Sequence, residues 1–134
     1  MRKSQALAIL RVALIVGACI DGFVAILALL FQPFIGALLD VPVRDPALTT
    51  IVGGEFAVVV LVYVALVRDL SRFAPLLWLV ALDQLLAVIL PGIEVVRGNI
   101  PATWKTLAPM PGSLALAAIY AWGAANFAKR KVMR

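Results

Sequence analysis

Three acidic residues stand inside long apolar stretches of this 134-residue sequence, namely Asp21, Glu55 and Asp83, and the last of them is followed by Gln84. An ionisable residue inside a membrane-spanning helix costs about 2.5–3.5 kcal/mol on insertion scales, so such residues are functional candidates. Two carboxyl groups in that setting can share a proton, or one can bond to the amide of Gln84. These four residues are therefore the candidates for binding a ligand or a proton.

The three acids are expected to lie at one depth in the membrane. Three arginines mark one membrane edge: Arg11, Arg68 and Arg72. From that edge Asp21 lies ten residues inward, Glu55 thirteen and Asp83 eleven. At 1.5 Å of rise per residue these depths are roughly 15, 20 and 17 Å. Three helices that each contribute one acid at a common level indicate a site.

Small residues on the side of Asp21 indicate that it points into a helix bundle, because small residues let neighbouring helices approach. Gly17 and Ala18 precede Asp21 by four and three residues, and Ala25 follows it by four. The last apolar run carries a second row of small residues at a spacing of four: Ala117, Ala121 and Ala125. This row packs either within the monomer or against a partner subunit.

Two interpretations of the acids remain open. In the first, they line a polar pocket that opens outward, with Arg44, Arg97 or Lys105 at its mouth. In the second, they form neutral hydrogen bonds between helices, which contribute on average about 0.6 kcal/mol and require no catalysis.

Several kinds of chemistry are excluded by composition. The sequence has no histidine and one cysteine, Cys19. The usual ligand sets of zinc, haem and iron–sulfur centres are therefore missing, as is a Ser-His-Asp or Cys-His nucleophile. We expect no metal, no cofactor and, on balance, no enzyme. The net charge of +5 gathers at helix ends, where it fits anionic lipid rather than nucleic acid.

The elements that must position these residues are membrane helices. Apolar residues make up 64% of the sequence and charged residues 14%, far from the roughly 45–50% and 25% of soluble domains. Four apolar runs reach the length of about 17–25 residues that a bilayer requires. They predict an all-α bundle of four transmembrane helices, at about 6–31, 46–67, 72–90 and 108–128, as one transmembrane domain over 1–134.

The helix boundaries carry local signals. Asp45 before Pro46 predicts an N-cap, Ser71 can cap the third helix, and Pro91-Gly92 predicts its end. Residues 33–40 form either a short helix in the outer membrane interface or a plain loop. Seven aromatic residues fall near the ends of the predicted helices and are interpreted as interfacial belts: Tyr63, Trp78, Trp122 and Phe127 on one side, and Phe31, Phe34 and Trp104 on the other.

The distribution of positive charge predicts the topology. Nine Lys and Arg residues fall on one side of the predicted helices and three on the other. Under the positive-inside rule both termini are cytoplasmic, which agrees with an even number of helices.

A few short features resemble a known group of proteins: Gly53-Gly54-Glu55 in the second helix, Arg68-Asp69 in a short basic turn, and Arg97-Gly98 in the last outer loop. Together with four helices in under 140 residues, they resemble the small bacterial DoxX-like and BphX-like membrane proteins. The resemblance covers most of the chain. It implies a four-helix bundle in the bacterial inner membrane, and it implies no activity and no catalytic residue.

Three functions are compatible with these features. The favoured one is an accessory or assembly subunit of a larger membrane complex, with a protein partner or a second copy held through the last helix. The second is a proton-coupled carrier of a small molecule or cationic amphiphile that works through the buried acids. The third is an in-membrane enzyme that uses two carboxyls as an acid–base pair on a lipid.

Overall fold

The computed structural model describes residues 3–40, 43 and 45–128. Its long helices are α1 (Lys3–Leu30), α3 (Pro46–Arg68), α5 (Leu77–Val96) and α7 (Pro109–Ala128). The short ones are α2 (Gln32–Leu39), α4 (Leu70–Phe73) and α6 (Trp104–Leu107), and a 3-10 turn at Ala74–Leu76 joins α4 to α5.

Within the described residues, four segments are long and apolar enough to span a membrane: Gln5–Leu30, Pro46–Arg68, Leu70–Val96 and Trp104–Asn126. Much of their apolar surface is not covered by protein; Val12 is 60% exposed and Leu61 68%. Large side chains exposed in this way fit a lipid environment, since a water-soluble bundle would place polar residues there. The expected all-α fold with four transmembrane helices is confirmed, and the chain is a small multi-pass membrane protein.

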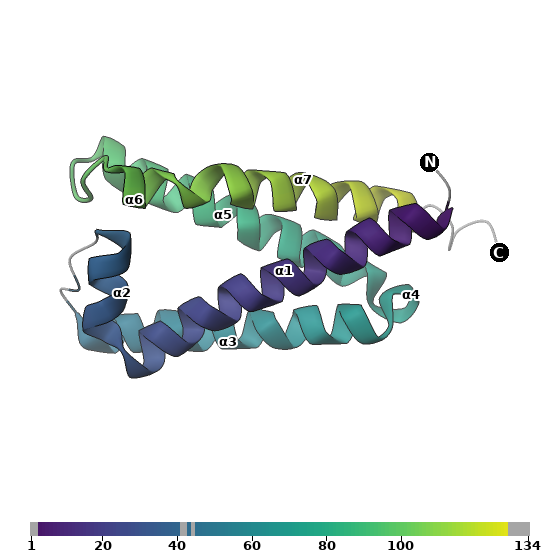
Figure 1. The fold of residues 1–134 in the computed structure, drawn as a ribbon, viewed down its shortest axis with the longest axis horizontal. Helices are drawn as coiled ribbons and strands as arrows, with labels where there is room; N and C mark the ends of the chain where they lie inside the picture. Colours follow the sequence, from purple (N-terminus) through teal and green to yellow (C-terminus); the bar gives the residue numbers. More distant parts are fainter. Residues whose placement is uncertain (1–2, 41–42, 44, 129–134) are drawn as a thin grey trace.

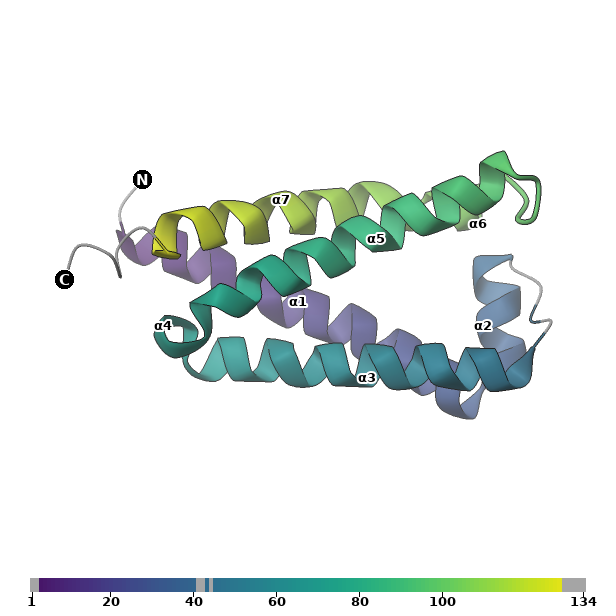
Figure 2. The same ribbon diagram turned by 180° about the vertical axis from the view of Figure 1, so that it is seen from behind.

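The long helices form two antiparallel pairs, α1 with α3 and α5 with α7 (Figures 1 and 2). At one end of the bundle, called here the α4 end, the first turns of α1 cross onto α7. At the opposite end, called the α2 end, the short helix α2 lies between the two helix pairs, and α6 lies at the start of α7.

The core lies in the half of the bundle toward the α4 end. It contains large side chains from all four long helices: Leu10, Leu14, Tyr63, Leu66, Leu77, Val80, Leu116 and Tyr120. Two glycines allow close helix contact, Gly123 at the core and Gly53 toward the α2 end. A Cβ on Gly123 would lie 2.9 Å from a methyl group of Leu10, and a Cβ on Gly53 would lie 2.9 Å from the Cβ of Ala28.

The start of α3 follows the sequence prediction. The side chain of Asp45 accepts hydrogen bonds from the backbone N–H of Ala47 at 2.8 Å and of Leu48 at 3.2 Å, with Pro46 at the first helical position. The segment left open as a helix or a loop is helical, since α2 covers residues 32–39.

The cap of the third membrane segment differs from the prediction. Asp69, not Ser71, occupies the N-cap of α4, and its carboxylate accepts from the backbone N–H of Arg72 at 3.0 Å. Ser71 instead donates its hydroxyl to the same carboxylate at 2.7 Å. The hydrogen bonds to Ser71 and Arg72 lower the pKa of Asp69 below its usual value of 3.8.

The end of α5 also differs from the prediction. The helix continues through Pro91 to Val96, because a proline in a membrane helix is tolerated where neighbouring groups compensate for the lost hydrogen bond. It stops at Gly98, whose φ of 74° is left-handed. There the backbone N–H of Asn99 donates to the carbonyl of Glu94 at 2.9 Å, and the N–H of Gly98 to that of Val95 at 3.0 Å. This pair of bonds is a Schellman motif, which requires glycine at that position.

Candidate functional site

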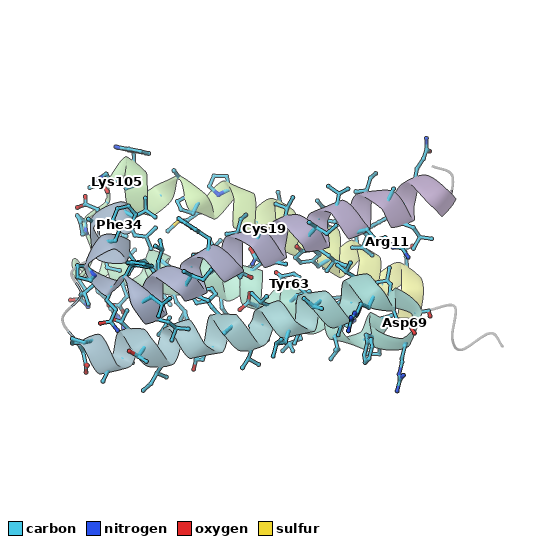
Figure 3. All side chains as sticks on the ribbon, turned by 60° about the horizontal axis from the view of Figure 1, so that its bottom comes forward. Arg11, Cys19, Phe34, Tyr63, Asp69 and Lys105 are labelled. Atoms are coloured by element: carbon cyan, nitrogen blue, oxygen red, sulfur yellow. The ribbon has the colours of Figure 1, made fainter. Side chains whose placement is uncertain are left out.

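Polar side chains from all four long helices meet within the bundle. This polar cluster consists of Asp21 on α1, Tyr63 on α3, Asp83 and Gln84 on α5, and Tyr120 on α7. Asp21 and Gln84 are each 3% exposed, and both tyrosines are fully buried. Figure 3 shows Tyr63 between the two ends of the bundle, with Arg11 and Asp69 toward one end and Phe34 and Lys105 toward the other.

The side-chain amide of Gln84 is the centre of the cluster. Its nitrogen lies 3.2 Å from the Oδ2 and 3.4 Å from the Oδ1 atom of Asp21. It also lies 3.2 Å from the hydroxyl oxygen of Tyr63 and 3.4 Å from the Oδ2 atom of Asp83. One residue of α5 therefore connects the α5–α7 pair to both helices of the α1–α3 pair.

The two tyrosines close the cluster on the side of the core. Their ring centroids lie 5.8 Å apart at an interplanar angle of 58°, a tilted arrangement that aromatic pairs favour. The hydroxyl of Tyr120 donates to the backbone carbonyl of Ala13 on α1 at 2.6 Å. That bond fixes α7 against α1 at the level of the core.

Gly17 makes room for this arrangement. A Cβ on Gly17 would overlap the hydroxyl of Tyr120 and lie 2.9 Å from two ring carbons of Tyr63. Close packing does occur at Gly17, and the groups that approach it are two aromatic side chains from other helices. Ala25 is buried as well, and Ala18 is half-buried.

The side-chain amide of Gln84 has more hydrogen-bond acceptors around it than it has hydrogens to donate. The amide nitrogen carries two hydrogens and has four acceptor atoms within 3.4 Å. In the described part of the chain, every buried side-chain nitrogen or oxygen has a hydrogen-bond partner. No group of three or more metal-ligating side chains occurs among the described residues.

Glu55 does not join this cluster. Its side chain is exposed on α3, two residues from Gly53, which packs on α1. Two residues turn a helix by about 200°, so Glu55 points away from that contact. The residue of α3 that reaches the cluster is Tyr63, eight positions further on, which the sequence analysis placed in an interfacial belt. That interpretation is wrong for Tyr63, because the side chain is fully buried.

A cavity of about 450 Å³ lies at the α2 end, away from the polar cluster. It will be called the end cavity. Its walls are mainly apolar side chains from α1, α2, α3 and the loop after α5: Ala28, Ile35, Leu39, Leu48, Val52 and Ile100. Four polar residues also line it: Asp45, Thr49, Glu94 and Asn99. It is lined by neither Asp21 nor Gln84, so among the described residues this cavity does not join those two side chains to the outer surface.

The residues expected at the mouth of a pocket have different positions. Arg97 forms an ion pair of 2.9 Å with Glu94 at the edge of the end cavity. Lys105 on α6 donates to the carbonyl of Ala37 at 3.2 Å, and the neighbouring Thr106 donates to that of Leu39 at 3.2 Å. These two bonds satisfy carbonyls at the end of α2, where a helix has no partners of its own. Arg44 lies outside the described residues.

The row of small residues on α7 lies beside the buried face of the helix. Ala121 packs against the core, Ala117 is half-buried and Ala125 is exposed. The fully packed positions are Leu116, Tyr120, Gly123 and Ala124. The row therefore contributes to packing inside the monomer and leaves one member, Ala125, facing outward.

No protein-family model, no curated protein and no solved structure matches this chain.

Proposed function

We propose that this protein is a non-catalytic accessory or assembly subunit of a larger complex in the bacterial inner membrane, of the same general kind as the DoxX-like proteins that the sequence resembles. In this proposal both termini are cytoplasmic. The observation that supports it is the closed state of the polar cluster: Asp21, Gln84 and the two tyrosines are buried and bonded to one another or to backbone. Groups held in this way stabilise a bundle and are poorly placed to meet a substrate.

The partner in this proposal binds α7 from the lipid side. Ala125 is exposed on that helix, and small residues permit the close approach of another membrane helix. The large exposed apolar side chains of α7, Leu114 and Trp122, add contact area on either side.

Purification in native lipid nanodiscs tests the proposal. The tagged protein is expected to co-purify with a partner at fixed stoichiometry, or as a homo-oligomer. The variant Ala125→Phe should weaken that association, whereas Val58→Phe should leave it intact, because Val58 is exposed on α3 and not on α7. A protein that runs as a lone monomer in native lipid contradicts the proposal.

A second function, a carrier of a small amphiphile, is favoured by one observation, the end cavity between the two helix pairs. In that case the buried acids would exchange the coupling proton. Asp21→Asn and Asp83→Asn should then abolish uptake or resistance phenotypes of cells that depend on the protein. Unchanged phenotypes in both variants eliminate this function.

A further inference from the structure

We propose that the end cavity is a binding site for a small amphiphile with a cationic amine head and an apolar body. This inference deepens the carrier function proposed above, since it concerns the same end cavity, and it requires neither transport nor a partner protein on the α7 surface. It rests on the shape of the cavity, the chemistry of its walls and the hydrogen-bonding state of its polar groups.

The walls suit an apolar body of modest size. Ile35 and Leu39 on α2 face Leu48 and Val52 on α3 across the cavity. A volume of about 450 Å³ falls in the lower part of the range of roughly 300–1,000 Å³ for ligand pockets. That volume admits one short chain or a small ring system and not a two-chain phospholipid.

The polar groups at the cavity are mainly hydrogen-bond acceptors. Thr49 already donates its hydroxyl to the carbonyl of Asp45 at 3.0 Å. Asn99 donates one amide hydrogen to Glu94 at 2.7 Å, which leaves its second amide hydrogen as a donor and its carbonyl oxygen as an acceptor. The carboxylates of Asp45 and Glu94 accept only. Because acceptor sites outnumber donors, a ligand that donates hydrogen bonds fits these groups best.

The charge at the cavity favours a cation among the possible donors. Two carboxylates line it, and no Lys or Arg side chain of the described residues does. Arg97 neutralises part of the charge of Glu94, but its side chain is 66% exposed and does not line the cavity. A charge-assisted bond from an ammonium group contributes more than one from a neutral hydroxyl.

The position of the cavity gives an amphiphile access from the membrane. The cavity is open-sided and lies where the two helix pairs stand apart, beside α2 (Figures 1 and 2). Phe34 of α2 is 59% exposed, as expected for a short helix that contacts lipid. An amphiphile at that level keeps its head near the polar surface and its body toward the bilayer, the orientation that the cavity requires.

The test uses photoreactive probes on the full-length protein in phosphatidylcholine nanodiscs. Three probes share one short alkyl chain with a diazirine and differ in the head group, which is a primary amine, an alcohol or a carboxylate. The sites of labelling are mapped by mass spectrometry. We expect the amine probe to label the segments that contain Leu48, Val52 and Ile100 about tenfold more than the carboxylate probe does.

Two variants and one control separate binding from simple partitioning into lipid. Glu94→Gln should reduce labelling by the amine about tenfold, as expected for the loss of a charged hydrogen bond of 1.5 kcal/mol or more. Val52→Trp should fill the cavity and reduce labelling by all three probes. The control is Glu55→Gln. Glu55 is an exposed carboxylate on α3, the helix of Val52, and does not line the cavity, so its replacement should leave the labelling by all three probes unchanged.

Three results overturn the proposal. One is equal labelling of the cavity by all three probes, which would describe a lipid-filled space. Another is labelling concentrated on lipid-facing residues of α3 such as Val58 and Leu61. The third is amine labelling that Glu94→Gln leaves unchanged, and this variant decides the matter even if Val52→Trp does not fold.

Discussion

The two halves of this bundle differ in how closely their helices pack. Toward the α4 end, all four long helices pack on one another through large side chains, including two buried tyrosines. Toward the α2 end, the helix pairs separate, and the space holds a short helix, two capping side chains from α6 and a cavity. The polar cluster lies at the edge of the packed half, where Gln84 joins the two pairs. A membrane bundle of this size can thus be closely packed at one end and hold a cavity at the other.

The difference between the two halves of the bundle follows from where their hydrogen bonds lie. In lipid, the hydrophobic effect does not drive helices together, so packing and polar contacts decide where they associate. The bonds of Gln84 and Tyr120 tie the helices together in the packed half. The end cavity has polar groups that are bonded within their own loop or helix turn, as in Asp45 with Ala47 and Glu94 with Asn99.

The largest effect is expected for Gln84→Leu. The variant removes the amide donor from the buried carboxyl of Asp21, and a buried polar group left without its partner costs about 2–3 kcal/mol. The free energy of unfolding, measured in bicelles, should fall by that amount. The matched change Glu55→Gln at an exposed position should remain within about 0.5 kcal/mol of the wild type. An equal loss in both variants would contradict the importance of the cluster.

Glycine-to-alanine substitutions should lower the stability of the protein in the packed half but not at the α2 end. Gly17→Ala drives a Cβ into the ring of Tyr63 and the hydroxyl of Tyr120 and should destabilise the protein by about 1–3 kcal/mol, as overpacking does. Gly92→Ala, on α5 toward the α2 end, meets no atom within 4 Å and should be neutral or stabilising by up to about 1 kcal/mol, because alanine favours helix. Thermal unfolding in detergent measures both. If Gly17→Ala proved harmless, the tyrosines would not sit as described.

Replacing a valine by phenylalanine should also affect stability differently in the two halves, and this difference should be smaller. Val80→Phe adds volume to a fully buried position of the core and should cost about 1–2 kcal/mol. Val52→Phe extends into the end cavity, where room exists, and should change stability by less than about 0.5 kcal/mol. Similar losses for the two variants would show that the cavity is not open space.

The smallest effect concerns pH and the cap of α4. The pKa of Asp69 is lowered in the folded protein by its bonds to Ser71 and Arg72. The stability that this carboxylate contributes is present above its unfolded value near 3.8 and is lost as the pH falls through the lower, folded value. Between about pH 5 and pH 3 the melting temperature of the wild type should therefore decline slightly more than that of Asp69→Asn, since asparagine caps a helix without titrating. Parallel curves would contradict a titrating cap.

Much of the fold could be predicted from the sequence because the bilayer restricts the possibilities so strongly. Four apolar runs of sufficient length predict four helices, and the cap at Asp45 and Pro46 predicts the start of α3 to the residue. The end of α5 could not be read from Pro91. The helix ends at Val96, six residues beyond the predicted end at residue 90, and the signal for this end was Gly98, since a left-handed residue there closes the helix.

The site could be predicted only in part. Counting residues from the arginines brought Asp21 and Asp83 to one level, and the structure joins both to Gln84. Counting gives depth along a helix but not the direction of the side chain, and for that reason Glu55 was placed in the group. Tyr63 was missed because a position near a helix end is typical of interfacial aromatics, and no pattern in the sequence singles out Tyr120. Gly17 was the available signal, since a glycine one turn from a buried acid leaves room for a ring from another helix.

The central claim, that Asp21 and Gln84 bind one another and hold the two helix pairs together, is tested most directly by a double-mutant cycle. Unfolding free energies are measured in bicelles for Asp21→Leu, Gln84→Leu and the double variant. The structure predicts that the double variant loses less than the sum of the two single losses, by about 0.5–2 kcal/mol. Losses that add to within about 0.3 kcal/mol would mean that the two side chains do not interact.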